Sequence, residues 1–239
     1  MTQAASRAKK TSATRRGRPR KNVQERAYSD RRAELLLEAA RLFRAKGYHG
    51  TTTRDIAAAV DMQSGSPFYY FESKGELLSA VMQAGMAIAS EHQERVLAAM
   101  NPGATPREQL QALVAGHLQV LFDVGRDFMP ILVYEWPWLT TSQRAAVAAQ
   151  KDAYEAAWMP ALTGLHTRGE LRSRPEVARF FIFGALNWTI HWFRPEGALT
   201  LDALVEEAMK LFVDPSPKAA APQPWRTSNP DPHPENLLT

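Results

Sequence analysis

Apolar residues recur at helical spacing through almost the whole of residues 29–213, and this pattern restricts the possible folds more than any other feature. Segment 30–46 shows it first, with apolar side chains at positions i, i+3, i+4 and i+7 of one helical face: Leu36, Ala39, Ala40 and Phe43. No segment has the convincing alternation of apolar and polar residues that a half-buried strand requires. The sequence therefore predicts an all-α fold.

Polar segments flank this helical region on both sides. Residues 1–28 lack the periodicity and are rich in Arg, Lys, Ser, Thr and Ala, which predicts a disordered arm. Residues 214–239 contain seven prolines, so we expect a disordered tail outside the fold. Between them, the capping patterns predict a small head over 29–78 and a larger helical body over 79–213.

Positive charge is concentrated at the N-terminal end. Residues 1–32 hold eleven Lys or Arg against Glu25 and Asp30, a sum of +9, and the remaining 207 residues carry −5 of the total +4. Such a concentration suits a single polyanionic partner, either nucleic acid or an anionic membrane surface. No stretch approaches the roughly 18 apolar residues of a membrane span. Because the chain has no cysteine, we exclude disulfides and thiolate metal sites and expect a cytoplasmic protein.

Capping residues bound the first two helices of the head. Ser29 is expected to cap the first helix, and Gly47 is expected to end it. Thr52 and Asp55 are three residues apart, which predicts a capping box in which each side chain bonds to the other residue's backbone N–H. The second helix is therefore expected over 52–60.

A turn and a third helix complete the head. Asp61 occupies the turn, and the third, short helix is expected over about 64–70. Ser73 and Glu76 form a further capping box, which opens a fourth helix that runs to about Met100 and links head and body. The body is predicted to contain these helical segments: 105–123 with a cap at Thr105 and Glu108, 128–139, 141–168 with a kink at Pro160, 173–193 with a cap at Ser173, and 200–212.

The second and third helices have the dimensions of a helix-turn-helix, although an αα corner is also a common packing unit. The third helix opens with the short polar residues that close approach of base edges requires: Gln63, Ser64, Gly65 and Ser66. Aromatic side chains follow that can pack on a thymine methyl or donate to a phosphate: Phe68, Tyr69 and Tyr70. Phe71 is expected in the core, with Phe68 as a second candidate, because consecutive residues cannot share one helical face.

Two cations lie where helix dipoles disfavour them. Helix N-termini near Thr52 and Ser73 present free N–H groups suited to phosphate oxygens. Arg54 and Lys74 lie in these first turns, where a positive charge opposes the dipole. Contact with DNA phosphates explains both cations, and a solvated surface charge is the alternative. Thr53, directly before Arg54, is included in the predicted DNA-binding surface.

Five motifs occur together within residues 36–78: Gly47-Tyr48, Thr51-Thr52-Thr53-Arg54-Asp55-Ile56-Ala57, Gly65-Ser66, Tyr69-Tyr70-Phe71 and Ser73-Lys74. Together they resemble the DNA-binding domain of the tetracycline-repressor (TetR) family. The resemblance implies an all-helical homodimer whose interface is made by the last two helices. It also implies base contacts from Ser64, Gly65, Ser66, Phe68 and Tyr69, and phosphate contacts from Thr52, Tyr70 and Lys74.

The motif departs from the usual family pattern at three positions. Asp61 stands where a glycine is usual, and aspartate can adopt the left-handed conformation at modest cost. Pro67 replaces a usual leucine, so it must lie in the first turn of its helix, where its missing N–H matters little. Phe68 replaces a frequent tyrosine and so lacks a hydroxyl contact.

The arm carries a second DNA-binding candidate. Its segment Arg16-Gly17-Arg18-Pro19-Arg20 resembles the core of an AT-hook. In such a segment Arg16, Arg18 and Arg20 fit the narrow minor groove of A·T tracts. A generic polycation that binds phosphates without sequence preference is the alternative.

The body is rich in aromatic residues that could line an apolar ligand pocket: Tyr134, Trp136, Trp138, Trp158, Trp188 and Trp192. Any one of them could equally belong to the core. Residues 187–197 are similar to the end of TetR-family regulators that sense acyl-CoA, and Arg194 or Arg172 could meet the CoA phosphates. The alternative is that this segment merely turns the chain between two dimer helices.

These features predict a transcriptional regulator that a small hydrophobic or acyl-CoA-type effector releases from a palindromic operator. An enzyme is not expected, since the histidines show no metal-ligand spacing and no nucleophile lies beside a base, and no metal or cofactor is expected. An architectural DNA-binding protein without a ligand is the alternative function. The large aromatic body disfavours it, because such a role requires no aromatic core of this size.

Overall fold

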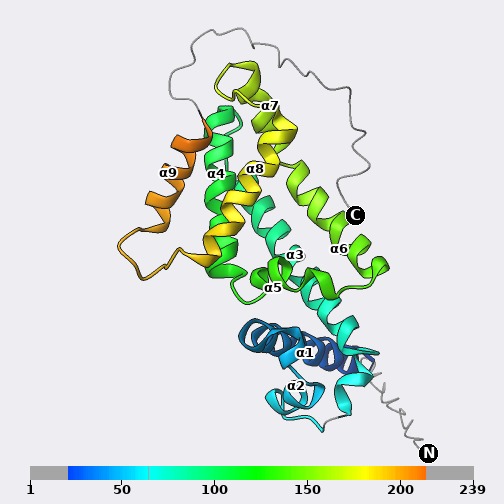
Figure 1. The fold of residues 1–239 in the computed structure, drawn as a ribbon. Coiled ribbons are helices and arrows are strands. Elements are labelled where there is room, and N and C mark those ends of the chain that lie inside the picture. Colours follow the sequence, from blue (N-terminus) through cyan, green and yellow to red (C-terminus); the bar gives the residue numbers. More distant parts are fainter. Residues whose placement is uncertain (1–20, 64, 214–239) are drawn as a thin grey trace, which may run out of the picture.

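The computed structural model describes residues 21–63 and 65–213, and within these residues it is built of helices without a strand. Figure 1 shows a head of α1, α2 and a short 3₁₀ helix η1, placed below a larger body. The head elements are α1 (Lys21–Gly50), α2 (Thr53–Ala59) and η1 (Ser66–Tyr69), and α3 (Lys74–Ala98) runs from the head into the body. The predicted all-α fold is confirmed.

The remaining helices form the body. They are α4 (Pro106–Gln119), a π-helical turn η2 (Val120–Val124), α5 (Met129–Tyr134), the 3₁₀ helix η3 (Trp136–Trp138), α6 (Thr141–Ala156), α7 (Met159–Thr167), α8 (Pro175–Trp188), the 3₁₀ helix η4 (Thr189–His191) and α9 (Leu201–Phe212). Helix α3 packs on α6, α4 and α1, and α4 packs on α7 and α9. None of the described helices combines the length and hydropathy needed to cross a membrane.

One apolar core continues from the head into the body. Phe43 and Ile56 are buried in the head, Met82 is buried on α3, and Trp158 is fully buried between α6 and α7. Because the cluster is continuous, head and body are not separated by a polar layer. Movement in the body can therefore reach the head through packed side chains.

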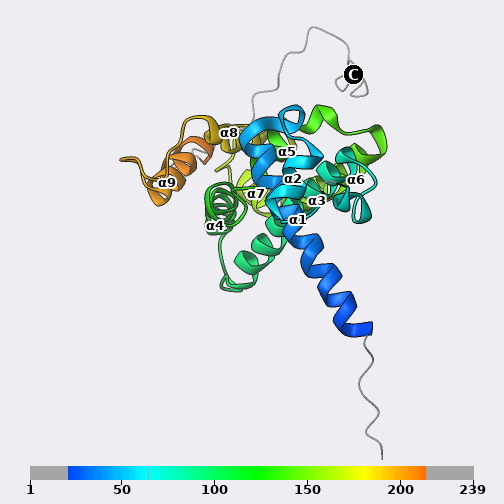
Figure 2. The ribbon, with the colours of Figure 1, turned by 90° about the horizontal axis from the view of Figure 1, so that it is seen from below.

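The N-terminal end of α1 differs from the prediction. The helix begins at Lys21 rather than at residue 30, so the assignment of Ser29 as its cap is wrong, and residues 21–28 are helical rather than disordered. This stretch contains no glycine or proline to end a helix. Tyr28 also packs on the head, with its ring stacked 4.8 Å from that of Tyr70. Figure 2 shows the first turns of α1 projecting away from the rest of the molecule.

Most other local predictions in the head are confirmed. Gly47 interrupts α1 with φ of +72°, and Asp61 occupies the turn with φ of +52°. Thr52 caps α2 in a reciprocal box with Asp55. Ser73 caps α3, although the Glu76 carboxylate accepts from the N–H of Glu72 rather than from that of Ser73.

Two predictions in the body require correction. The helix expected over 141–168 is two helices, because the chain breaks between α6 and α7, and Pro160 lies in the first turn of α7. Proline cannot donate an N–H within a helix, and at a helix start none is needed. Ser173 does not cap α8, which begins at Pro175 without a side-chain cap. The box of Thr105 and Glu108 at the start of α4 is confirmed.

Candidate DNA-binding surface and ligand cavity

The recognition element is a short 3₁₀ helix rather than the longer helix predicted over 64–70. Pro67 and Phe71 are buried beneath it and fix it to the core, and Pro67 lies in its first turn as expected. Tyr69 projects outward with 75% of its surface exposed. A Cβ at Gly65 would meet no atom within 4 Å, so the backbone is open to close approach there. Ser66 is half-buried beside it.

Several predicted contact residues cannot be placed. Ser64 and the arm residues Arg16, Arg18 and Arg20 lie outside the described residues, as does the side chain of Phe68. Gln63 is exposed just before η1, and its carbonyl accepts from the N–H of Ser66.

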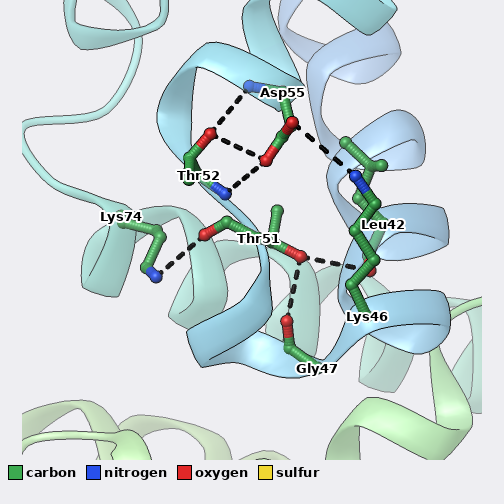
Figure 3. Close-up of polar contacts among 7 residues, drawn as sticks. All are labelled: Leu42, Lys46, Gly47, Thr51, Thr52, Asp55 and Lys74. Atoms are coloured by element: carbon green, nitrogen blue, oxygen red, sulfur yellow. Dashed lines mark hydrogen bonds and ion pairs between the residues drawn. The ribbon is translucent and has the colours of Figure 1, made fainter.

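At the start of α2 the side chains of Thr52 and Arg54 are exposed and that of Thr53 is half-buried, but the Thr52 side chain is already bonded to Asp55. Figure 3 shows the Thr52 hydroxyl and backbone N–H both directed at the Asp55 carboxylate, at 2.7 and 2.8 Å. These two hydrogen bonds lower the pKa of Asp55, the side-chain bond most strongly. Because both donors of Thr52 are already engaged, we infer that Thr52 shapes the helix start. Arg54 beside it is exposed.

Lys74 joins the start of α3 to the end of α1. Its Nζ donates to the carbonyl of Tyr48 at 2.8 Å and to that of Thr51 at 3.0 Å, and it lies 4.1 Å from the centre of the Tyr48 ring. Figure 3 shows the contact with Thr51. Thr51 is itself fully buried, and its hydroxyl lies within bonding distance of the carbonyls of Leu42 and Gly47. Two of the three ammonium protons of Lys74 are therefore used within the head.

The head contacts the body at the end of α1. The backbone N–H of Tyr48 donates to Oε1 of Glu135 at 3.2 Å, and the ring of Trp138 lies edge-on to His49 with centres 4.1 Å apart. Farther along α1, Arg44 forms an ion pair with Asp127 at 2.6 Å. Glu135 directly precedes η3 and Trp138 is its last residue, so this short segment lies against the chain that leads into α2.

A cavity of about 460 Å³ lies within the body, walled by α3, α4, α5, η3, α6 and α8. Most of its lining is apolar: Met86, Met129, Leu132, Val133, Tyr134, Trp136, Pro137, Val147 and Phe183. A few polar side chains complete it: His117, Lys151, Tyr154, Glu155 and Asn187. This volume and composition are typical of sites for small molecules.

The polar side chains of the cavity are anchored by one another. His117 is completely buried, with Nδ1 2.9 Å from the Tyr154 hydroxyl and Nε2 3.1 Å from Oδ1 of Asn187. Burial lowers the pKa of His117 to about 4, so the imidazole is neutral near pH 7. Glu155 accepts from Lys151 at 3.0 Å and from Arg179 at 2.8 Å. The charges of Glu155, Lys151 and Arg179 are therefore paired with one another at the cavity wall.

Comparison with known proteins decides the family. The model for bacterial regulatory proteins of the tetR family matches residues 35–81, and that for the tetracyclin repressor-like C-terminal domain matches residues 103–215. The HTH-type transcriptional repressor KstR2 of Rhodococcus jostii (strain RHA1) is 28% identical over 190 residues, covering 78% of this chain and 91% of that protein. The chain belongs to the TetR family.

Solved structures share this fold. The structure of superantigen PfiT is 39% identical in sequence, with a TM-score of 0.67. The match covers 78% of this chain and 97% of the PfiT chain. The structure of AibR in complex with isovaleryl coenzyme A and operator DNA is 29% identical in sequence, with a TM-score of 0.68. The match covers 76% of this chain and 97% of the AibR chain. This TetR-family protein is thus a DNA-binding transcriptional regulator with a helix-turn-helix head, and it is not an enzyme.

The predicted ligand-binding aromatics of this TetR regulator lie in different places. Tyr134 and Trp136 line the cavity. Trp158 is in the core, where its indole N–H donates to Gln93, and Trp138 packs on the head. The remaining residues, Trp188, Trp192 and Arg194, lie on or near the surface around η4. There Trp188 packs on His191, and Arg194 donates to the carbonyls of His191 and Phe193.

Several residues that shape these sites were missed by sequence reasoning. They are Tyr28 against Tyr69 and Tyr70, Glu135 at the head, and His117 and Tyr154 in the cavity. Their partners are distant in sequence, so no local spacing marks them. His117 offered the one usable signal, since a histidine among the apolar residues of a helix invites the question of its partners.

The last two helices expose apolar surface on α8 more than on α9. Phe181 and Trp188 on α8 are 73% and 62% exposed, and Gly184 between them has open space around it. On α9, Leu204, Val205 and Ala208 are buried, and α9 packs on α4. Leu211, on the same helix, is 82% exposed.

Proposed function

We propose that this TetR-family regulator is a homodimeric repressor that leaves its operator when a CoA thioester places its acyl group in the cavity. One observation carries this proposal. Trp136 and Pro137 line the cavity, while Glu135 and Trp138 on either side of them hold the end of α1. A ligand against this segment therefore acts on the chain that leads into the helix-turn-helix.

The dimer is proposed to form through α8. Phe181, Gly184 and Trp188 follow the i, i+3, i+7 spacing of one helical face, and the two side chains are exposed in the single chain. An exposed apolar stripe of this kind is typical of an interface between subunits. In the dimer, two recognition elements would enter successive major grooves about 34–36 Å apart, or a multiple of this distance.

The proposed DNA contacts follow the exposed surface of the head. Base contacts are assigned to the recognition element: Gln63, Ser64, Gly65, Ser66, Phe68 and Tyr69. Phosphate contacts are assigned to its flanks: Thr53, Arg54, Tyr70 and the third ammonium proton of Lys74. Thr52 supports these contacts through its box with Asp55. The arm arginines would add affinity through the minor groove or the phosphates.

The acyl group is the part of the effector that the cavity suits. The cavity has a volume of about 460 Å³ and an apolar lining, which fit a short or branched hydrocarbon chain. The nucleotide of CoA would therefore lie outside the cavity. Lys151 lines the cavity and is about half exposed, and Arg144 on the same helix donates to the carbonyls of Leu139 and Pro137. Arg194 does not line the cavity, so Lys151 and Arg144 are the proposed partners of the CoA phosphates. The AibR complex with isovaleryl coenzyme A and operator DNA supports this class of effector.

Release is proposed to follow from a difference in affinity between two states of the body. A ligand changes DNA affinity only if it binds one conformation more tightly than the other. Filling the space beside Trp136 would shift η3 and with it Glu135, which accepts the hydrogen bond from Tyr48. The two heads would then no longer match the spacing of the operator half-sites.

The test is a titration of CoA esters into the complex of the full-length protein with the DNA upstream of its own gene. Acetyl, isovaleryl, hexanoyl and decanoyl esters would be compared by fluorescence anisotropy of the labelled DNA. We expect release that strengthens with acyl size until the cavity is full, and none with free CoA. Release by a neutral hydrophobe together with failure of every CoA ester would contradict the proposed effector.

A further inference from the structure

The cavity contains a chain of three polar side chains whose role the acyl group alone does not explain. Tyr154 on α6, His117 on α4 and Asn187 on α8 are joined in that order by hydrogen bonds of 2.9 and 3.1 Å. All three line the cavity. Burial of polar groups in an apolar site is costly, so their arrangement should serve the ligand as well as the fold.

The chain of hydrogen bonds has a direction. Since Oδ1 of Asn187 can only accept, Nε2 of His117 must carry the proton. A neutral imidazole then leaves Nδ1 as an acceptor, so the Tyr154 hydroxyl donates to it. The burial that holds the His117 pKa near 4 and raises the pKa of Tyr154 keeps both groups neutral.

The reverse direction is disfavoured by Tyr154. If Asn187 donated to His117, then His117 would donate to the Tyr154 hydroxyl, whose own hydrogen would need another acceptor. Within the described residues the hydroxyl has His117 as its hydrogen-bond partner and no second acceptor. A buried hydroxyl without an acceptor costs about 1–3 kcal/mol, which favours the first direction.

Other contacts hold these three hydrogen-bonded side chains in place. The backbone carbonyl of Tyr154 accepts from Nε2 of Gln93 at 3.1 Å, and the amide oxygen of Gln93 accepts from the indole N–H of Trp158 at 2.8 Å. Trp158 is fully buried. The orientation of Tyr154, and through it of His117 and Asn187, is thus set by the core rather than by the solvent.

Asn187 is left with an unused donor. Its oxygen is occupied by His117, and within the described residues its side-chain NH₂ has no hydrogen-bond partner. Asn187 is half-buried and lines the cavity, so this group can be reached by a bound molecule. His117 and Tyr154 cannot substitute for it, because Tyr154 directs its hydrogen to His117 and His117 directs its hydrogen to Asn187.

We propose that Asn187 selects the effector by donating a hydrogen bond to a carbonyl oxygen, so that the cavity prefers carbonyl compounds to hydrocarbons of the same shape. His117 and Tyr154 act as positioning residues that fix the asparagine with its NH₂ group toward the ligand. The inference rests on the proposed function in taking this cavity as the effector site. For a CoA thioester, the acceptor is the thioester carbonyl next to the acyl chain.

Two pairs of probes separate the carbonyl from the rest of the ligand. The first is isovaleryl-CoA and its thioether analogue, in which CH₂ replaces the carbonyl. The second, without CoA, is cyclohexanone and methylenecyclohexane, which have the same ring and differ in C=O against C=CH₂. Dissociation constants for the full-length protein would be measured by calorimetry for the first pair and by NMR of the tryptophan indole signals for the second.

We expect the wild-type protein to prefer the carbonyl member of each pair by about tenfold, the effect of one well-placed hydrogen bond. Asn187→Ala should bring both ratios close to one by weakening the carbonyl member while leaving the other unchanged. His117→Phe should also reduce the ratios, although His117 need not touch the ligand, because the asparagine amide is then free to rotate. Asn187→Ser retains a small donor and should keep part of the preference, and its folding is checked by thermal denaturation.

The outcomes distinguish this inference from the proposed function. If isovaleryl-CoA binds but wild type and Asn187→Ala show equal ratios, the role of Asn187 is refuted and the CoA effector stands. If no CoA compound binds but cyclohexanone is preferred in wild type and not in Asn187→Ala, the role of Asn187 is supported and the CoA effector is refuted. If the wild-type protein shows no preference within either pair, the inference is overturned.

Discussion

The helix caps of the head and the polar network of the cavity in this TetR regulator satisfy their side chains in opposite ways. In the head, Thr52 bonds to Asp55 and Ser73 to Glu76, three residues away in each case. In the cavity, His117 bonds across 37 residues to Tyr154 and across 70 residues to Asn187. The proposed DNA-binding surface therefore rests in part on local capping geometry, whereas the proposed ligand cavity is formed by helices that meet only in the complete fold.

The largest expected effect tests the dependence of the cavity on the fold. Trp158→Ala removes a fully buried side chain and the hydrogen bond to Gln93, so we expect a loss of about 3–5 kcal/mol in the free energy of unfolding. The matched control is Trp138→Ala, which truncates a half-exposed indole and should cost about 1 kcal/mol. Denaturant unfolding followed by circular dichroism measures both. Equal losses would show that the Trp158 network does not organise the body.

The pH dependence of stability tests the buried histidine. Because the pKa of His117 falls from 6.5 to about 4 on folding, the unfolded chain binds the proton first as the pH is lowered. Between pH 6.5 and pH 4, the free energy of unfolding of the wild-type protein should therefore fall by about 3 kcal/mol because of this residue.

Comparison with His117→Gln isolates that contribution, since both proteins share all other titrating groups. The stability difference between them should shrink as the pH falls through this window. A difference that stays constant with pH would show that His117 is not held neutral by the cavity.

Lys74 tests whether a cation of the head serves the fold as well as DNA. Lys74→Met keeps the apolar stem but loses two charged hydrogen bonds to the carbonyls of Tyr48 and Thr51, and we expect a loss of about 2 kcal/mol in unfolding free energy. Lys74→Arg, which retains the charge, should recover part of this loss. Thermal unfolding and operator affinity are measured on the same samples. Weaker DNA binding with unchanged stability would assign Lys74 to phosphate contact alone.

The smallest effect concerns the turn between α2 and η1. Asp61 has φ of +52°, a conformation that glycine adopts without steric cost. Asp61→Gly should stabilise the protein by about 0.5 kcal/mol, or about 1–2 °C in Tm, because the greater entropy of glycine in the unfolded chain offsets part of the gain. Asp61→Ala keeps a Cβ and should not stabilise. A lower Tm for the glycine variant would show that the aspartate side chain itself stabilises the turn.

The contrast between the two regions also explains what could be predicted from the sequence. The boxes at Thr52 and Thr105, the break at Gly47 and the turn at Asp61 were predictable, because each depends on residues within one helical turn of each other. The start of α1 was not, because Tyr28 gains its partner from a segment some forty residues later. Of the aromatic pocket residues, the sequence could propose Tyr134 and Trp136 but could not separate them from the core residue Trp158.

The cavity is proposed to act on the head through Glu135, and the affinity for isovaleryl-CoA with and without bound operator DNA tests this coupling. Glu135→Ala removes the acceptor of the Tyr48 N–H, and Glu135→Gln keeps an oxygen at that position as a matched control. Glu135 does not itself line the cavity, so affinity in the absence of DNA should stay within about twofold of wild type.

In wild type and Glu135→Gln, bound DNA should weaken ligand binding by about tenfold or more, a typical coupling between two sites. In Glu135→Ala the ratio should fall close to one. An unchanged ratio in Glu135→Ala, with wild-type affinity for both ligand and DNA, would contradict the account.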